Sequence, residues 1–292
     1  MDVSVIVPTR DRHQQLQLFL ESISKWKVPS SIDWEVLIVD NNPSTPETQI
    51  VVAWHAKRNP RIKYLRENRP GKSAAVNAAL RVARGEFLAF TDDDCIAHPD
   101  WLCEIVNVMR AEPLLGAIGG RVELYDPTHK PVTLRLSKES VRFEPTQNLF
   151  NCIAGCNMAL RREVVEKIGG LDITLGPGTP LKAAEDIDYL YRAHKSGARA
   201  MYSPRPLVLH NHGRTTDEQV TALHAAYLKG RGAFYWKHRL DRVIQKVIYW
   251  EVRVLIRERD WRTVAKLLGG FCAAVRGMRV RTESAIPAPS IL

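Results

Sequence analysis

The apolar residues of the first hundred positions follow two alternating patterns. Short continuous runs rich in Val, Ile and Leu are typical of strands that a parallel sheet buries on both faces. Those runs lie at residues 3–8, 34–40, 62–65 and 87–91. The intervening segments, which carry apolar residues at helical spacing, span residues 11–26, 44–58 and 71–85. The alternation predicts an α/β fold with a doubly wound, mostly parallel sheet flanked by helices.

The pattern becomes less regular after residue 112. It predicts a strand over 117–125 and a short strand followed by a helix within 152–172. A further helix is predicted over 183–197, followed by another short strand. Residues 126–148 are polar and give no clear element. The sequence shows no internal repeat that would indicate a solenoid or a propeller.

Polar residues follow three of the predicted strands. Thr9 and Arg10 follow the first strand, Asp40 ends the second, and Asp92–Asp94 follow the fourth. Because ligands bind at the carboxyl edge of such sheets, these side chains are expected to share one site. Taken alone, each of them is more simply a turn residue or a helix cap.

The acidic run in "FTDDDC" has two interpretations. It is either a solvated turn after a strand or a metal site. Alternate residues of an extended chain point the same way, so Asp92 and Asp94 are expected to face one ion while Asp93 points elsewhere. Two carboxylates and a hard cation suit Mg²⁺ or Mn²⁺, which takes phosphate oxygens as further ligands.

Three further motifs contain residues that could act as a base, bind a metal or bind a phosphate. In "AEDIDY", Glu185 and Asp186 are either a charged first helical turn or an acceptor-side pair with a general base. In "VLHNHG", His210 is either structural or a ligand that completes a metal site. In "RPGKSAAVN", Arg66 occupies the position of the first glycine of a phosphate loop, so that motif is rejected. Lys72 at the helix start can still meet a phosphate.

A set of seven motifs resembles family 2 glycosyltransferases in order and spacing. They are "VIVPTRDR", "VLIVDNNPS", "NRPGKSAAVNAAL", "FTDDDCIAHPDWL", "GCNMALRRE", "AEDIDYLYR" and "VLHNH". The resemblance covers residues 2–214 and implies the GT-A fold, a Rossmann-like sheet merged with an acceptor-binding half. It implies inverting transfer of a sugar from a nucleotide-sugar, most commonly UDP-linked, to a hydroxyl of a glycan, lipid-linked or small-molecule acceptor. It also implies a Mg²⁺ or Mn²⁺ cofactor.

The resemblance also assigns residues to roles. The nucleotide-sugar would be bound by Pro8, Thr9, Arg10, Asp40, Lys72, Asp92 and Asp93. The metal would be bound by Asp92, Asp94 and His210. Asp186 would be the catalytic base, and Glu185 and Trp101 would contact the acceptor, although Trp101 is equally consistent with a core aromatic at the start of a helix.

Several functions can be set aside because the sequence lacks the motifs that they require. The "QxxRW" motif and the membrane helices of processive polysaccharide synthases are absent, so long-chain processive synthesis is not expected. A sugar-nucleotidyltransferase would need a glycine-rich loop after the first strand, and "VPTRDR" has no glycine. An aspartate-nucleophile phosphatase is disfavoured by Ile96. A non-catalytic sugar-nucleotide binder would not need Asp186. The expected role is therefore polysaccharide or glycan biosynthesis by an enzyme.

The excess of positive charge is confined to one end of the chain. Residues 229–281 hold 14 Lys or Arg and 4 Asp or Glu, whereas the rest of the chain has 28 of each. Within residues 239–261, apolar positions such as Val243, Ile244 and Leu255 share one helical face. The helix is expected either to pack on the domain with a basic rim or to bind an anionic membrane surface. No nucleic-acid-binding motif is present.

These observations predict an organisation and a location. A catalytic domain is expected over 1–214, with a nucleotide-sugar half at 1–112 and an acceptor half at 113–214, and a basic, mainly helical extension over 215–292. Five scattered cysteines without a CxxC pair favour free thiols. No signal peptide or spanning helix is expected. The expected location is cytoplasmic, with peripheral binding to the inner face of the plasma membrane.

Overall fold

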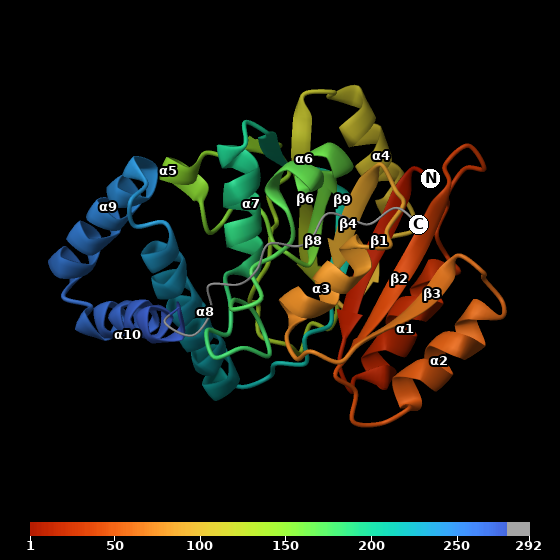
Figure 1. The fold of residues 1–292 in the computed structure, drawn as a ribbon, viewed down its shortest axis with the longest axis horizontal. Helices are drawn as coiled ribbons and strands as arrows, with labels where there is room; N and C mark the ends of the chain where they lie inside the picture. Colours follow the sequence, from red (N-terminus) through yellow and green to blue (C-terminus); the bar gives the residue numbers. More distant parts are fainter. Residues whose placement is uncertain (279–292) are drawn as a thin grey trace.

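The computed structural model describes residues 1–278, built around one mixed sheet (Figure 1). The strand order is β3-β2-β1-β4-β8-β6-β9-β5, and β7 pairs with β9. The strands are β1 (Val3–Thr9), β2 (Trp34–Asn41), β3 (Ile62–Glu67), β4 (Phe87–Thr91), β5 (Cys95–Ala97), β6 (Leu115–Leu124), β7 (Val141–Arg142), β8 (Asn157–Arg161) and β9 (Arg199–His210). The part of the predicted extension at 279–292 lies outside the described residues.

Helices cover both faces of the sheet (Figure 1). They are α1 (His13–Ile23), α2 (Glu47–Ala56), α3 (Lys72–Leu80), α4 (Trp101–Ala111), α5 (Pro145–Asn148), α6 (Arg162–Ile168), α7 (Glu185–Lys195), α8 (Asp217–Lys237), α9 (Arg242–Glu258) and α10 (Trp261–Met278). None of these helices, which all lie in the described part of the chain, is long and apolar enough to cross a membrane.

The first four predicted strands are confirmed, and they pair as the doubly wound interpretation requires. β1 lies parallel to β2 and to β4, and β2 lies parallel to β3. All seven residues of β1 are buried because each face of the sheet is covered. Ile6 packs into the core on the α3 and α7 side, whereas Val5 and Val7 pack into the core on the α1 and α4 side. Alternate side chains of one strand therefore pack into two different hydrophobic cores.

The second half of the sheet differs from a purely parallel arrangement. β8 is antiparallel to both β4 and β6. β9 extends over twelve residues, although only a short strand is expected at its start. Pro204 and Pro206 lie where the register between β6 and β9 shifts, and proline, which lacks an N–H donor, is tolerated at such an interruption. The longer β9 carries the chain back to the edge of the sheet that holds the aspartates.

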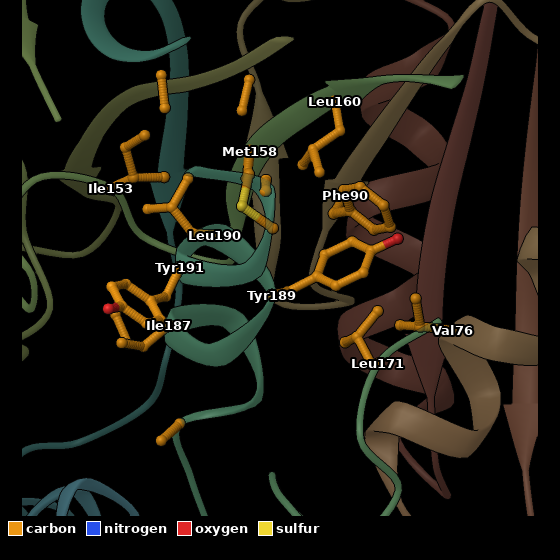
Figure 2. Close-up of a cluster of buried hydrophobic side chains, with 14 of the residues drawn as sticks. Val76, Phe90, Ile153, Met158, Leu160, Leu171, Ile187, Tyr189, Leu190 and Tyr191 are labelled. Atoms are coloured by element: carbon orange, nitrogen blue, oxygen red, sulfur yellow. The ribbon is translucent and has the colours of Figure 1, made fainter. Parts of the chain in front are cut away.

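Helix α7 is anchored in the core that lies between the sheet and the C-terminal helices (Figure 2). Tyr189 meets Phe90 of β4 edge to face, with the ring centroids 6.1 Å apart. Leu190 and Tyr191 are also fully buried. The anchoring fixes the position of the residues at the N-terminal end of α7, which include Glu185 and Asp186.

The five cysteines are all free thiols, as expected from their spacing. Cys152 and Cys156 are buried, and each belongs to one of the two hydrophobic cores.

Candidate active site

A cavity of about 610 Å³ opens beside the carboxyl ends of β1 and β4. Its wall is built by loops after β1, β4 and β9, by the starts of α3 and α7, and by one face of α8. Ten of the residues predicted from the sequence line it, namely Pro8, Thr9, Arg10, Lys72, Asp92, Asp93, Asp94, Glu185, Asp186 and His210. The fold therefore brings together side chains that lie up to two hundred positions apart.

The three aspartates form a turn rather than an extended segment. The backbone N–H of Cys95 donates to the carbonyl of Asp92 over 3.2 Å, which bends the chain between them. The expected alternation is therefore wrong. Asp93 and Asp94 both bind the guanidinium of Arg12, at 2.8 and 2.9 Å, whereas Asp92 is paired with Lys72 at 2.5 Å.

The two aspartates that share Arg12 differ in the pKa of their carboxyl groups. Burial, reinforced by the charge of Asp94 and opposed by Arg12, raises the pKa of the Asp93 carboxyl to about 7. Asp93 also accepts a hydrogen bond from the Thr9 hydroxyl at 2.7 Å. Burial acts in the same direction on Asp94, but the hydrogen bond with His210 and the charge of Arg12 outweigh it and hold the Asp94 pKa well below its usual range.

His210 completes the group around Asp94. Its Nε2 lies 3.4 Å from Oδ1 of Asp94. Burial lowers the pKa of the imidazole, but the hydrogen bond with Asp94 raises it to about 9. One ligand atom from each of Asp94, Cys95 and His210 lies within 4.8 Å of the other two. The carboxylate and imidazole are donors that suit a divalent cation, and the Nδ1 atom of His210 is buried without a hydrogen-bond partner.

Lys72 and Glu185 lie beside the acidic turn under a loop formed by residues 171–184. The loop is tied to α3, since the backbone N–H of Lys72 donates to the carbonyl of Pro177 over 3.0 Å. Lys72 Nζ lies 3.8 Å from Glu185. Burial and the neighbouring charge of Asp186 raise the pKa of Glu185 to about 7. Burial lowers the pKa of Lys72, but the charges of Asp92 and Glu185 raise it well above its usual value.

Asp186 is held by two backbone donors at the start of α7. Its Oδ2 accepts from the N–H of Gly155 over 3.0 Å, and its Oδ1 accepts from the N–H of Ile187 over 2.8 Å. A carboxylate has about four acceptor positions, so two backbone bonds leave lone pairs free. Asp186 is half-buried in the wall of the cavity and has no ion-pair partner among the described residues. Asp186 therefore presents carboxylate lone pairs without hydrogen bonds in the cavity wall.

Two predicted site residues do not line the cavity. Trp101 is fully buried in the core that covers the α1 side of the sheet, and its indole N–H donates to Asn157 over 2.8 Å. The predicted acceptor contact of Trp101 is therefore wrong, because the amphipathic helix α4 turns this ring inward. Asp40 is buried beside the cavity and accepts from the Tyr64 hydroxyl over 2.9 Å, while its other oxygen is unpaired.

Sequence reasoning missed several residues of the cavity wall. Arg12 lies in the quoted "VPTRDR", but no spacing rule shows that it crosses to Asp93 and Asp94. Gly155 binds Asp186 from thirty-one positions away. Tyr227 of α8 also lines the cavity.

Comparisons with known proteins agree with this geometry. The chain is 28% identical over 231 residues to the O-antigen biosynthesis protein RfbC of Myxococcus xanthus, covering 72% of this chain and 17% of that protein. It is 35% identical over 156 residues to the poly(ribitol-phosphate) beta-N-acetylglucosaminyltransferase TarS of Staphylococcus aureus, covering 50% of this chain and 27% of TarS. The chain thus spans about a quarter or less of these two relatives.

A solved structure has the same fold. The mannosyltransferase PcManGT of Pyrobaculum calidifontis, determined with GDP-Man and Mn²⁺, superposes with a TM-score of 0.65 at 22% identity, covering 94% of this chain and 75% of that one. The predicted GT-A fold with C-terminal helices is confirmed. The family model described as glycosyl transferase family 2 matches residues 4–169. The chain therefore belongs to glycosyl transferase family 2.

Proposed function

We propose that the protein is an inverting glycosyltransferase that moves a sugar from a UDP-linked nucleotide-sugar to a hydroxyl of an acceptor. The observation that supports it most is the arrangement of one cavity. Asp186, free of any ion pair among the described residues, shares the cavity with the Asp94–His210 pair. Inversion needs one base for the acceptor hydroxyl and a charge-stabilising group for the leaving diphosphate.

Asp186 would remove the proton of the attacking hydroxyl. The bonds from Gly155 and Ile187 keep the carboxylate oriented towards the cavity while lone pairs stay available. The raised pKa of Glu185 leaves this neighbour partly neutral near pH 7, which reduces repulsion between adjacent carboxylates. Lys72 lies between Glu185 and Asp92 and would meet the diphosphate by charge.

A divalent cation, Mg²⁺ or Mn²⁺, fits the residues beside the acidic turn. Asp94 and His210 already converge, and Asp92 would add a carboxylate if its pairing with Lys72 were given up. When bound, the cation neutralises charge that develops on the leaving diphosphate. The nucleoside would lie against Pro8, Thr9 and Arg10, with Asp93 at the ribose and Asp40 near the base.

The relatives suggest an acceptor of the glycan type. One is named for O-antigen biosynthesis and another for transfer to poly(ribitol phosphate), so we propose a role in polysaccharide or cell-surface glycan synthesis. We further propose a catalytic domain of residues 1–214, with halves at 1–112 and 113–214. The C-terminal part from 215 would then complete the cavity through α8.

Replacement of the proposed base tests the function. Asp186→Asn keeps the size of the side chain and is expected to lower transfer by at least about 100-fold while Mn²⁺-dependent nucleotide binding stays near wild type. Transfer is measured with a panel of radiolabelled nucleotide-sugars. Wild-type turnover in Asp186→Asn would disprove the assignment. Consumption of a sugar phosphate and a nucleoside triphosphate would instead indicate a nucleotidyltransferase, and binding without turnover in the wild type would indicate a non-catalytic binder.

The outward face of α9 supports peripheral binding to an anionic membrane. The apolar face predicted from the sequence packs on the domain through Val243, Ile244 and Leu255. The opposite face presents exposed basic and large apolar residues, namely Arg242, Lys246, Tyr249, Trp250, Arg253, Ile256 and Arg257. Arg253 donates to the Tyr249 hydroxyl over 2.8 Å. Cations interspersed with Trp and Tyr suit the boundary of an anionic bilayer, in keeping with a cytoplasmic location at the inner face of the plasma membrane.

Vesicle sedimentation tests the membrane proposal. Lys246→Glu with Arg253→Glu is expected to abolish binding to phosphatidylglycerol vesicles at low salt, since each cation near an anionic surface contributes about 1 kcal/mol. Lys138→Glu with Arg142→Glu makes the same change in charge at exposed positions in and just before β7, away from α9, and serves as the control. Equal sedimentation of both double variants would show that α9 does not contact lipid.

A further inference from the structure

The cavity that contains Asp186 is also lined by basic side chains that no carboxylate within residues 1–278 neutralises. Arg12 and Lys72 are paired with the aspartates of the turn, and Arg231 is paired with Glu251 at 2.5 Å. Arg10, which also lines the wall, lies 3.9 Å from Asp11. The other three basic residues of the wall are Arg135, Lys182 and Arg214. No residue of that group has an ion pair within residues 1–278.

The side chain of Arg135 is fixed in position. Its guanidinium donates to the carbonyls of Leu134 and Phe150, at 2.9 and 3.1 Å, and its Nε atom is buried without a partner. Backbone carbonyls orient the group but do not cancel its charge. Arg135 is therefore a preorganised cation in the cavity wall, rather than a mobile surface side chain.

Arg214 lines the same cavity as Asp186. The backbone N–H of Lys130 donates to the carbonyl of Arg214 over 2.8 Å, which ties the segment after β9 to the segment that carries Thr133 and Arg135. Thr133, which also lines the wall here, has a φ of 60°, a conformation that β-branched residues rarely adopt. Lys182 and Ala184 on the facing loop also have positive φ values, of 65° and 73°. Unusual backbone conformations of this kind cluster at functional sites, and here they occur in two segments of one cavity wall.

We infer that the acceptor carries a phosphate ester, which Arg135, Arg214 and Lys182 bind while its hydroxyl is presented to Asp186. This inference deepens the proposed function and rests on it. A phosphate oxygen accepts several charge-assisted hydrogen bonds at once, and arginine is the residue best suited to bind it in two places. The donor diphosphate would have its own partners at the acidic turn, so it does not account for the unpaired cations of the cavity wall.

A binding experiment separates the acceptor site from the donor site. The full chain is loaded with Mn²⁺ and UDP and then titrated by calorimetry with sn-glycerol 3-phosphate or with glycerol, its neutral counterpart. The phosphate is expected to bind at least about tenfold more tightly than glycerol, and Arg135→Gln with Arg214→Gln is expected to remove that preference. Affinity for UDP with Mn²⁺ should change less than about threefold. Arg142→Gln, an exposed arginine outside the cavity, is the control.

The outcomes are distinct. Equal binding of the phosphate and glycerol, or a fall in UDP affinity with phosphate binding intact, overturns the inference alone. Absence of metal-dependent nucleotide binding in the wild type overturns the proposed function and the inference with it. A parallel titration with dihexanoyl phosphatidylglycerol identifies the source of the phosphate. Tighter binding of this lipid indicates a lipid-linked acceptor, and tighter binding of glycerol phosphate indicates a soluble or polymeric one.

Discussion

Gly155 and Asp186 are in direct contact in the wall of the cavity. The Gly155 N–H donates to Oδ2 of Asp186, and a Cβ atom built on Gly155 would lie 2.7 Å from that same oxygen. A side chain at position 155 is therefore excluded by the carboxylate and not by the backbone conformation, since Gly155 does not have a positive φ. The glycine acts as a positioning residue for the proposed base.

Gly155→Ala is expected to displace Asp186 without unfolding the protein. A shift of about 1 Å in a catalytic group lowers turnover by roughly 100-fold. Nucleotide binding should be unaffected, because the acidic turn and His210 do not contact Gly155. Steady-state kinetics and calorimetry on the same preparation check this. A folded variant with wild-type turnover would show that the carboxylate moves aside without loss of function.

Asp94 and Asp92 are expected to differ in their effect on nucleotide affinity. Asp94 converges with His210, whereas Asp92 is occupied by Lys72. Asp94→Asn should weaken Mn²⁺-dependent UDP binding by at least about tenfold, and Asp92→Asn should weaken it less. Calorimetry with and without Mn²⁺ gives both values. Equal losses in the two variants would indicate that both carboxylates bind the cation, as expected from the sequence.

Asp188 is expected to govern stability at acid pH. This fully buried carboxylate binds Arg192, Lys237 and His238, each within 2.9 Å. Burial raises its pKa, but the hydrogen bond from His238 and the charges of Lys237 and Arg192 lower it far more. A depressed pKa contributes stability that is fully present above the ordinary aspartate value of about 3.9 and is lost as pH falls below it.

Asp188→Asn should therefore be destabilising by about 3 kcal/mol at pH 7, because it leaves buried cations unpaired. The difference from wild type should shrink as pH falls from about 4 towards 2. Urea unfolding at a series of pH values measures it. A difference that stays constant over that range would mean that the Asp188 charge does not contribute.

Two adjacent glycines of α10 provide a matched pair. A Cβ at Gly270 would lie 2.0 Å from the carbonyl oxygen of Lys229 in α8, whereas a Cβ at Gly269 meets no atom within 4 Å. Gly270→Ala is expected to cost about 1–3 kcal/mol by forcing α8 and α10 apart. Gly269→Ala should be neutral or stabilising by up to about 1 kcal/mol. Urea unfolding compares the two, and equal stabilities would show that the helices adjust freely.

Local patterns along the chain were enough to predict the first four strands and most of the site. Buried β-branched runs, helical spacing and polar residues at strand ends predicted β1 to β4 and the wall residues Thr9, Arg10, Asp92, Asp93 and Asp94. Lys72, Glu185, Asp186 and His210 came from separate motifs, and Pro8 came from the resemblance to family 2 glycosyltransferases. The same local patterns gave the wrong geometry for the aspartates. An extended chain was assumed where the bond from Cys95 to Asp92 makes a turn.

The folded chain, and not its local patterns, determines which side chains meet. Arg12 pairs with Asp93 and Asp94, and Gly155 donates a hydrogen bond to Asp186. Tyr227 lies in α8, within the basic C-terminal segment that was expected to be an extension of the catalytic domain, and yet it lines the cavity. Trp101 could face either the acceptor or the core, and the packing of α4 turned it inward. Such pairings depend on the path of the chain between distant segments. Periodicity along the sequence does not record that path, because it specifies which face of an element is buried but not what lies opposite it.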